Sequence, residues 1–367
     1  DYRCWWNFRD LPAINTANPD WRKYMITGEH SVVRAWLHDG ASGWRLDVAD
    51  ELPDDVLRGM RSAAKETNPD SVLLGEVWED AVTKVSYGER RQYALGDALD
   101  SVMNYPLRDG LVTFLTGRST ARALADLLLC QRLNYPRPLY YALMNLTASH
   151  DVARTRSALA LDFDPRSRTR AELAALEITD AMAARGAQLQ VLAAAVQFWL
   201  PGIPSIYYGD ETGMQGLCDP FNRAPLQMCD TQMLQWYAQL TALRHAHPAL
   251  TRGEVAVFAP AGDVLCVLRV IADGRDAFGE EAEDEALLLI VNRAAHPVRC
   301  HVELTCPGAG LCEETRLAFV RSEYDCAADC TDDTHIAIRD GVGAFDLPPH
   351  AAKIYRLENR HGTETGS

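Results

Sequence analysis

Between about residues 40 and 250, short apolar runs alternate with longer amphipathic stretches. The short runs show little alternation of polar and apolar positions, which is typical of strands buried on both faces. We predict strands at residues 41–48, 72–77, 99–103, 140–146 and 203–208. Apolar residues at helical spacing predict helices at residues 53–67, 108–129, 170–200 (one or two helices) and 231–245. Strands alternating with helices predict a parallel sheet, either doubly wound or closed into a barrel.

Beyond about residue 252 the apolar runs follow one another without helical stretches between them. The strands predicted in this part are residues 255–258, 264–270, 286–291, 298–304, 316–319, 335–338 and 351–357. Consecutive strands without helices predict an antiparallel β domain of sandwich type. We therefore expect an α/β domain that ends at residue 252, an all-β domain over residues 253–358 and a polar tail at residues 359–367.

The composition places the chain among folded globular proteins. Hydrophobic residues make up 47% and charged residues 24% of its 367 residues, which argues against disorder. The 36 basic and 51 acidic residues give a net charge of −15. Because such a chain repels phosphate groups, we expect neither a nucleic acid nor an anionic membrane as partner.

The opening residues DYRCWWNFRD contain neither the charged nor the apolar region of a signal peptide, and no transmembrane run is visible. We therefore expect a cytoplasmic protein. The chain begins without methionine inside an aromatic-rich segment, which indicates a start within a longer protein. Ten cysteines at irregular spacing, without a C-x-x-C motif, favour free thiols over a disulfide framework, and a zinc site is less favoured than either.

Three acidic residues follow predicted parallel strands at their carboxyl ends: Asp47, Glu76 and Asp151. In a barrel these strand ends converge on one face, where active sites form. With 51 acids in the chain, any one of them falls near a strand end by chance. The prediction of a site therefore rests on the three acids together.

The surroundings of two of these acids differ. Arg45 lies two residues before Asp47, so both side chains share one strand face and the guanidinium favours the ionised carboxylate that a nucleophile requires. Glu76 is flanked by Gly75 and by apolar neighbours, where a carboxyl can retain its proton and act as an acid. Two carboxyl groups in unlike surroundings are what glycoside hydrolysis uses, with retention of configuration when they are about 5–5.5 Å apart.

Aromatic residues near these strand ends can stack on sugar rings. They are Trp5, Trp6, Trp44, Trp78 and Tyr105. Core packing is the alternative for each ring, and we favour it for Trp44. Other chemistries lack their motifs, since the chain has no G-x-S-x-G, Walker or strand-following G-x-G-x-x-G sequence. A metal site beside His150 lacks a second convincing ligand.

Several motifs in order resemble those of the α-amylase superfamily, glycoside hydrolase family 13. They are GWRLDVADELP, LLGEVW, NLTASHD, LPGIPSIYYGDETGMQG and DPFNR. Within the superfamily, the chain is most similar to neopullulanases, cyclomaltodextrinases and maltogenic amylases. WWNFRDLPAIN resembles the end of the family's inserted B domain, which assigns residues 1–30 to that domain and residues 31–252 to the catalytic domain.

The resemblance implies an α/β fold of the (β/α)8 TIM-barrel type, of which about the last five strand–helix units are present. The first three strands, most of the B domain and the earliest family motif are absent. We therefore expect the C-terminal part of a longer enzyme, with an open strand edge at residues 41–48 and a bare apolar interior. Alone, it should be poorly stable and weakly active or inactive.

The resemblance also implies residue roles. Asp47 is the nucleophile, Arg45 its electrostatic partner and Glu76 the acid/base. Asp151 and His150 bind sugar hydroxyls and stabilise the distorted ring. The other implied substrate contacts are Trp78, Arg154, Asp219 and Arg223, the last two on the donor side.

The implied activity is retaining hydrolysis of α-1,4 or α-1,6 bonds in glucans or maltooligosaccharides. No cofactor is expected and calcium is not indicated. The oligomeric state stays open, with a homodimer of the full-length protein as one candidate. Two alternatives stay open, namely a transglycosylase of the same superfamily and a non-catalytic amylase-like binding protein. After DPFNR the chain reads APLQ where relatives usually carry a Tyr-Pro-Trp-like stretch, which leaves the donor-side specificity open.

Overall fold

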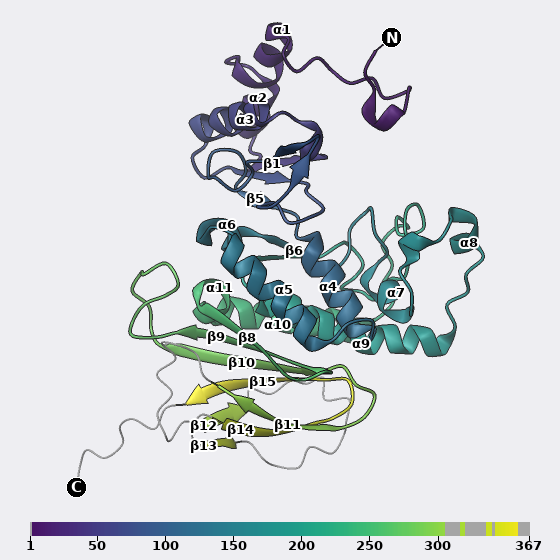
Figure 1. The fold of residues 1–367 in the computed structure, drawn as a ribbon, viewed down its shortest axis with the longest axis vertical. Helices are drawn as coiled ribbons and strands as arrows, with labels where there is room; N and C mark the ends of the chain where they lie inside the picture. Colours follow the sequence, from purple (N-terminus) through teal and green to yellow (C-terminus); the bar gives the residue numbers. More distant parts are fainter. Residues whose placement is uncertain (1, 305–315, 320–334, 340–341, 359–367) are drawn as a thin grey trace. The chain divides into compact units, whose positions relative to one another are not determined.

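The computed structural model describes residues 2–304, 316–319, 335–339 and 342–358 (Figure 1). The chain divides into two compact units. The first unit comprises Asp1–Met103 with Asn134–Ala142, and the second comprises Asn104–Leu133 with Leu143–Ser367. The predicted tail at residues 359–367 lies outside the described residues.

The first unit contains a small parallel sheet with the strand order β1-β2-β5. Its strands are β1 (Gly43–Leu46), β2 (Val72–Gly75) and β5 (Ser101–Val102). Among the described strands β1 pairs only with β2, so β1 is an edge strand, as expected. The other elements of this unit are η1 (Trp5–Asn7), α1 (Pro19–Arg22), η2 (Lys23–Thr27), α2 (Val32–His38), η3 (Ala49–Glu51), α3 (Asp54–Thr67), β3 (Val85–Ser86), β4 (Glu89–Arg90) and α6 (Arg137–Ala142).

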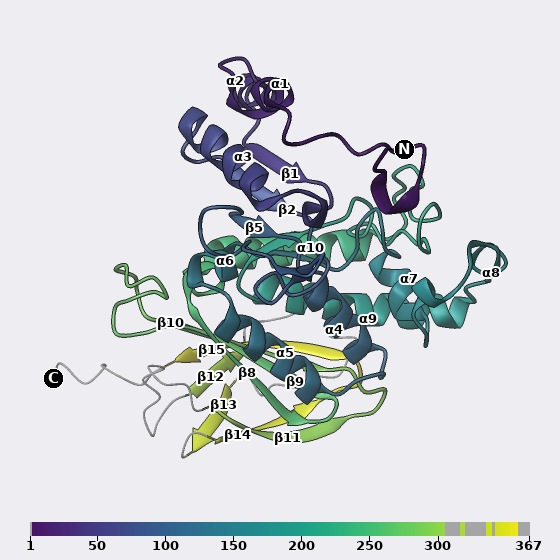
Figure 2. The same cartoon turned by 45° about the horizontal axis from the view of Figure 1, so that its top comes forward.

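Helix α3 connects β1 to β2 and packs against the sheet (Figure 2). Its buried residues recur at helical spacing and form one apolar face; they are Val56, Leu57, Met60, Ala63 and Ala64. Asp54 and Asp55 occupy its first turn, where negative charge is favourable. This connection brings β2 parallel to β1, with Leu46 opposite Gly75.

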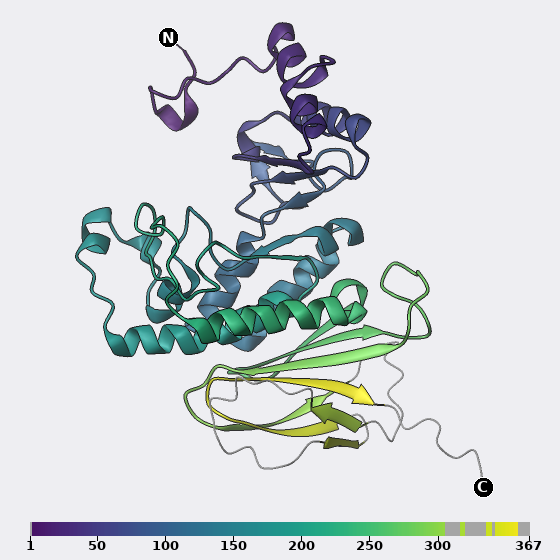
Figure 3. The same cartoon turned by 180° about the vertical axis from the view of Figure 1, so that it is seen from behind.

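The second unit begins with helices around a short parallel strand pair, β6 (Met144–Leu146) and β7 (Ile203–Ser205). Helix α9 (Asp180–Trp199) is buried over its C-terminal half and lies between α7 (Thr155–Ala160) and the C-terminal sheet (Figure 3). The other helices of this part are α4 (Tyr105–Leu115), α5 (Ala121–Asn134), η4 (Pro165–Ser167), α8 (Arg170–Ala174), α10 (Thr231–Ala246) and α11 (Pro248–Arg252).

The C-terminal part of the second unit is an antiparallel sheet with the strand order β11-β14-β13-β12-β15-β10-β9-β8. Its strands are β8 (Glu254–Ala261), β9 (Val264–Ile271), β10 (Glu285–Asn292), β11 (Val298–Glu303), β12 (Arg316–Phe319), β13 (His335–Arg339), β14 (Val342–Leu347) and β15 (Ala351–Glu358). Arg269 on β9 is fully buried and donates hydrogen bonds to the carbonyls of Trp199, Leu250 and Gly253. These bonds fix the helical part of this unit to its sheet.

All five predicted parallel strands are present, but several are shorter than expected. In the predicted strand at residues 140–146, only Met144–Leu146 is extended, because the preceding apolar residues belong to α6. The predicted helix at residues 108–129 is two helices, since Gly117 adopts a left-handed φ of 85° between α4 and α5. Strand β14 was missed; its Gly343 and Asp346 lower strand propensity although its burial alternates.

The six cysteines of the described ranges are free thiols: Cys4, Cys130, Cys218, Cys229, Cys266 and Cys300. The other cysteines lie outside the described residues. In the part of the chain that the structure describes, no helix combines the length and the apolar character needed to cross a membrane.

Two helical glycines provide a stability test. A Cβ on Gly186 of α9 would lie 2.4 Å from the carbonyl oxygen of Arg156, which is backbone of α7. We expect Gly186→Ala to lower the free energy of unfolding by about 2 kcal/mol, as overpacking does. A Cβ on Gly59 of α3 would have its nearest neighbour at 3.6 Å. Gly59→Ala should therefore stabilise by about 0.5–1 kcal/mol through helix propensity, and denaturant unfolding followed by circular dichroism would compare the two.

Candidate active site

Asp47 and Glu76 occupy equivalent positions on neighbouring strands. Asp47 follows β1 and Glu76 follows β2, and the residues before them, Leu46 and Gly75, are partners in the parallel register. The Glu76 N–H donates to the carbonyl of Leu46 at 3.0 Å, which continues the pairing past the strand ends. The sheet register therefore places both carboxylates at one edge.

One guanidinium contacts both carboxylates. Arg45 donates through Nη1 to Asp47 Oδ1, and its Nη2 lies 2.8 Å from Glu76 Oε2. The sequence predicted the first contact but not the second, because nothing in it shows that Arg45 reaches the next strand. The side chain of Asp47 is 75% exposed, whereas that of Glu76 is 5% exposed. The two carboxylates thus lie in unlike surroundings, one open to solvent and one enclosed.

Glu76 is held by two further donors. The backbone N–H of Val48 donates to Oε2 at 2.8 Å, and the indole N–H of Trp78 donates to Oε1 at 3.1 Å. The flanking residues led us to expect apolar surroundings for Glu76. Its carboxylate oxygens instead contact polar donors. Val48 has a φ of 40°, which is unusual for a β-branched residue. The residue that donates its N–H to Glu76 directly after Asp47 therefore has a strained backbone.

In the second unit, four of the predicted residues form one polar cluster, in which His150 and Asp151 follow β6 whereas Asp219 and Arg223 follow β7. His150 Nε2 lies 3.1 Å from Asp151 Oδ2, and Arg223 Nη2 lies 3.7 Å from Asp151 Oδ1. Arg223 Nε in turn lies 2.6 Å from Asp219 Oδ1. Asp151 and Arg223 are partly exposed, so this cluster can exchange hydrogen bonds with a polar ligand.

Asn222 fixes the backbone of this cluster and was missed by the sequence prediction. Its amide is buried and contacts the carbonyls of residues 149, 150 and 152 at 2.8–3.0 Å. The hydroxyl of Tyr105, a fully buried residue, lies 3.1 Å from Ser149 Oγ. Tyr105 therefore supports the loop that carries Asp151, and its ring is not exposed to a ligand. The sequence signal that could have located Asn222 is its place within the DPFNR motif.

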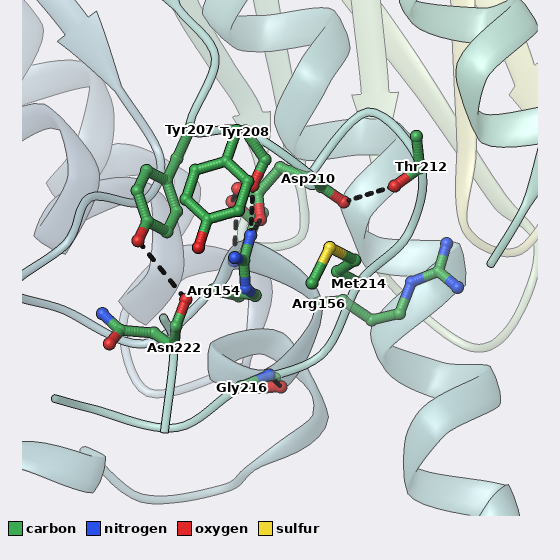
Figure 4. Close-up of polar contacts among 12 residues, drawn as sticks. Arg154, Arg156, Tyr207, Tyr208, Asp210, Thr212, Met214, Gly216 and Asn222 are labelled. Atoms are coloured by element: carbon green, nitrogen blue, oxygen red, sulfur yellow. Dashed lines mark hydrogen bonds and ion pairs between the residues drawn. The ribbon is translucent and has the colours of Figure 1, made fainter. Parts of the chain in front are cut away.

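Arg154 has no solvent-exposed surface. Tyr207, Tyr208 and Asp210 lie around its guanidinium (Figure 4). Its guanidinium lies 4.6 Å from the ring centres of both Tyr207 and Tyr208 and donates to the carbonyl of Tyr208. Its own N–H donates to the carbonyl of Gly216 at 2.9 Å. In this conformation the side chain holds loops together, so it does not offer the direct sugar contact expected from the sequence.

Asp210 lies beside Arg154 and is fully buried. Burial raises the pKa of Asp210 to about 6, against the opposing effects of the Thr155 hydroxyl and of Arg154. The Thr155 hydroxyl donates to Oδ2 at 2.5 Å, while Arg154 Nη1 is 3.8 Å from Oδ1. Asp210 is therefore a buried titratable group in the scaffold of the second unit.

The predicted aromatic residues have different environments. Trp44 is half-buried and donates to the carbonyl of Val33 at 3.2 Å, which agrees with a packing role. Trp5 and Trp6 are stacked with ring centres 4.7 Å apart. Within the described ranges, no three His, Cys, Asp or Glu side chains are grouped so as to hold a metal ion.

Comparison with known proteins places these residues in a family context. Residues 1–227 match the family model described as "Alpha amylase, catalytic domain". An amylopullulanase of Thermoanaerobacterium thermosulfurigenes is 30% identical over 330 residues, which cover 83% of this chain and 17% of that protein. Neopullulanase 2 of Thermoactinomyces vulgaris is 32% identical over 250 residues, 67% of this chain and 36% of that one. The chain thus spans well under half the length of these relatives.

The solved structures give the same result for the fold. A structure titled "Cyclomaltodextrinase" aligns with a TM-score of 0.73 and 25% identity, covering 97% of this chain and 52% of that chain. An α-amylase from Geobacillus thermoleovorans aligns with a TM-score of 0.70 and 21% identity, covering 96% and 67%.

Asp210 gives a pH-dependent prediction. Its folded pKa of about 6 exceeds the ordinary value of 3.8, so the folded state retains the proton where the unfolded state has lost it. Stability should therefore fall as the pH rises from about 4 to about 6, by roughly 3 kcal/mol from this group. Asp210→Asn should remove this loss, as measured by unfolding across that pH range. Asp126→Asn, on an exposed carboxylate, is the control; equal slopes in wild type and Asp210→Asn would contradict the assignment.

Proposed function

The chain belongs to the α-amylase catalytic-domain family, and we propose that it is part of a retaining glycoside hydrolase that cleaves α-glucosidic bonds. The observation that carries this proposal is the single guanidinium of Arg45 in contact with both Asp47 and Glu76. Retaining hydrolysis needs one accessible carboxylate to attack and a second to transfer the proton. The exposed Asp47 and the enclosed Glu76 suit these two roles.

The five parallel strands and their helices are the C-terminal part of an eight-fold barrel in this proposal. We assign residues 1–30 to the end of an inserted domain, residues 31–252 to the barrel and residues 253–358 to a C-terminal β-sandwich. The family match over residues 1–227 and the likeness to α-amylase structures support this division. The start of β8 at Glu254 supports the boundary near residue 252.

In the first step, Asp47 attacks the anomeric carbon and forms a glycosyl ester, while Glu76 donates its proton to the leaving oxygen. Arg45 balances the negative charge of Asp47 before the attack. Ester formation removes that charge, and Arg45 then pairs with the ionised Glu76 alone. Glu76 is thereby ready to take a proton from water in the second step, which releases the sugar with its configuration retained.

The cluster of His150, Asp151, Asp219 and Arg223 supplies hydrogen bonds to sugar hydroxyls in this proposal. Its supporting loop is fixed by Asn222, so the polar groups are held in place before a ligand arrives. Arg154 acts as a positioning residue within the same scaffold, through its contact with the carbonyl of Tyr208. Trp78 orients Glu76 through the hydrogen bond from its indole N–H, and it remains a sugar contact in this proposal.

The substrate class is an α-glucan or maltooligosaccharide. Relatives named amylopullulanase, neopullulanase and cyclomaltodextrinase support α-1,4 and α-1,6 linkages as the bonds that are cleaved. The two-carboxylate reaction uses no organic cofactor. The presence of Asp47, Glu76 and Asp151 together favours an enzyme over a non-catalytic binding protein.

Substitution of the two carboxylates tests the roles. In the protein expressed from its own gene, Asp47→Asn and Glu76→Gln should each reduce kcat on maltoheptaose by about 10³-fold or more, the range expected for loss of a nucleophile or a general acid. Asp97→Asn is the matched control, because Asp97 is an exposed first-unit acid paired with Arg58. Full turnover in either site variant would show that the role is wrongly assigned.

The stereochemistry of the first product is an independent test. Retention predicts that hydrolysis of an α-linked substrate initially releases the α-anomer, which proton NMR distinguishes from the β-anomer before mutarotation. Initial release of the β-anomer would exclude the covalent intermediate on Asp47.

A further inference from the structure

Strained backbone positions gather around one acidic residue of the first unit. Among the described residues, six non-glycine residues have a positive φ, and four of them are Trp6, Asn7, Val48 and Tyr87. Such conformations persist where surrounding contacts enforce them, and they are common at functional sites. Trp6 and Tyr87 both reach Glu51, and Val48 lies three residues before it.

Glu51 anchors both aromatic residues through one oxygen. The indole N–H of Trp6 donates to Glu51 Oε1 at 2.9 Å, and the hydroxyl of Tyr87 donates to the same atom. The hydrogen bond to Glu51 raises the pKa of Tyr87, so its hydroxyl remains a donor. Segments far apart in the sequence, η1 and the β3–β4 hairpin, thus present their aromatic side chains at one carboxylate.

The rings of Trp6 and Tyr87 are exposed to solvent although their polar atoms are hydrogen-bonded to Glu51. Trp6 is 63% exposed and Tyr87 is 68% exposed. Trp6 stacks on Trp5, and Arg3 lies 5.7 Å from the centre of the Tyr87 ring. These contacts hold the orientation of each ring while leaving much of its surface to solvent. Core packing therefore does not account for either side chain.

Hydrogen bonds connect this aromatic pair to the carboxylate site. The N–H of Glu51 donates to the carbonyl of Val48 at 2.9 Å, and the N–H of Val48 donates to Glu76 at 2.8 Å. Asp47 directly precedes Val48. The loop that carries the proposed nucleophile therefore also carries the anchor of both rings.

We propose that Trp6 and Tyr87 form an aromatic platform that binds a glucosyl unit of the α-glucan chain beside the Asp47–Glu76 site. A flat ring with a fixed polar end offers apolar surface to the C–H face of a sugar at little entropic cost. A glucan is neutral, so it can approach the acidic surface of this chain without repulsion. Two rings are too small an area for a stable protein partner, which needs about 1,000 Å². This inference rests on the proposed function.

Binding to maltoheptaose tests the platform. The background is Asp47→Asn, which prevents turnover, in the protein expressed from its own gene. Trp6→Ala and Tyr87→Ala should each raise the Kd measured by calorimetry about three- to tenfold. Tyr87→Phe keeps the ring but loses its hydrogen bond to Glu51, so its Kd should lie between those of the parent and of Tyr87→Ala. The matched controls are Trp36→Ala and Tyr24→Ala, exposed aromatic residues of the same unit, which should leave the Kd unchanged.

If an alanine variant does not fold, NMR of the protein with both rings intact tests the same proposal. The indole N–H resonance of Trp6, assigned by its disappearance in Trp6→Phe, should shift on addition of maltoheptaose, whereas that of Trp36 should not. Unchanged Kd values for both alanine variants, or an unmoved Trp6 resonance at saturation, would overturn the platform. Because turnover by the wild-type protein is measured separately, either result leaves the proposed function standing. Absence of both glucan binding and turnover in the wild type would overturn both proposals.

Discussion

The contact of Arg45 with two carboxylates is the interaction on which the site of the first unit depends. Asp47 and Glu76 follow neighbouring strands whose last residues are register partners, and one cation bridges the two carboxyl groups. Arg45 contacts both and lies on the strand that leads to Asp47. Because Glu76 is nearly buried, its ion pair is weakly screened by solvent and sets the geometry more firmly than the exposed Asp47 contact does.

Hydrogen bonds of the backbone also hold the loops that carry the carboxylates in place. The N–H of Glu76 donates to the carbonyl of Leu46, and the N–H of Ala49 donates to the carbonyl of Glu76. The N–H of Val48 donates to the Glu76 side chain. Val48 itself has a left-handed backbone conformation. In the second unit Asn222 has the same function for the Asp151 loop, using one amide for several carbonyls. In both units, hydrogen bonds that involve backbone groups fix the loop, while Asp47 and Asp151 remain exposed or partly exposed.

Sequence patterns located the five parallel strands, the helices between them and the three carboxylates, because these depend on local apolar periodicity and on residues adjacent in sequence. They did not locate contacts that depend on tertiary structure. Arg45 reaches Glu76 only because β2 lies beside β1, and Arg154 is enclosed only because Tyr207 and Tyr208 fold over it. Likewise, Gly117 separates α4 from α5, although the apolar pattern predicted one continuous helix. Apolar periodicity shows which face of a helix is buried, but it does not show where the helix ends.

The claim that Asp47 attacks the sugar is tested most directly by trapping the covalent intermediate. A 5-fluoro-α-glucosyl fluoride slows hydrolysis of the glycosyl ester, so the labelled protein can be digested and its peptides identified by mass spectrometry. The account predicts a single glycosylated peptide with the label on Asp47. A label on any other carboxylate, or turnover of the reagent with inversion and no label, would contradict it.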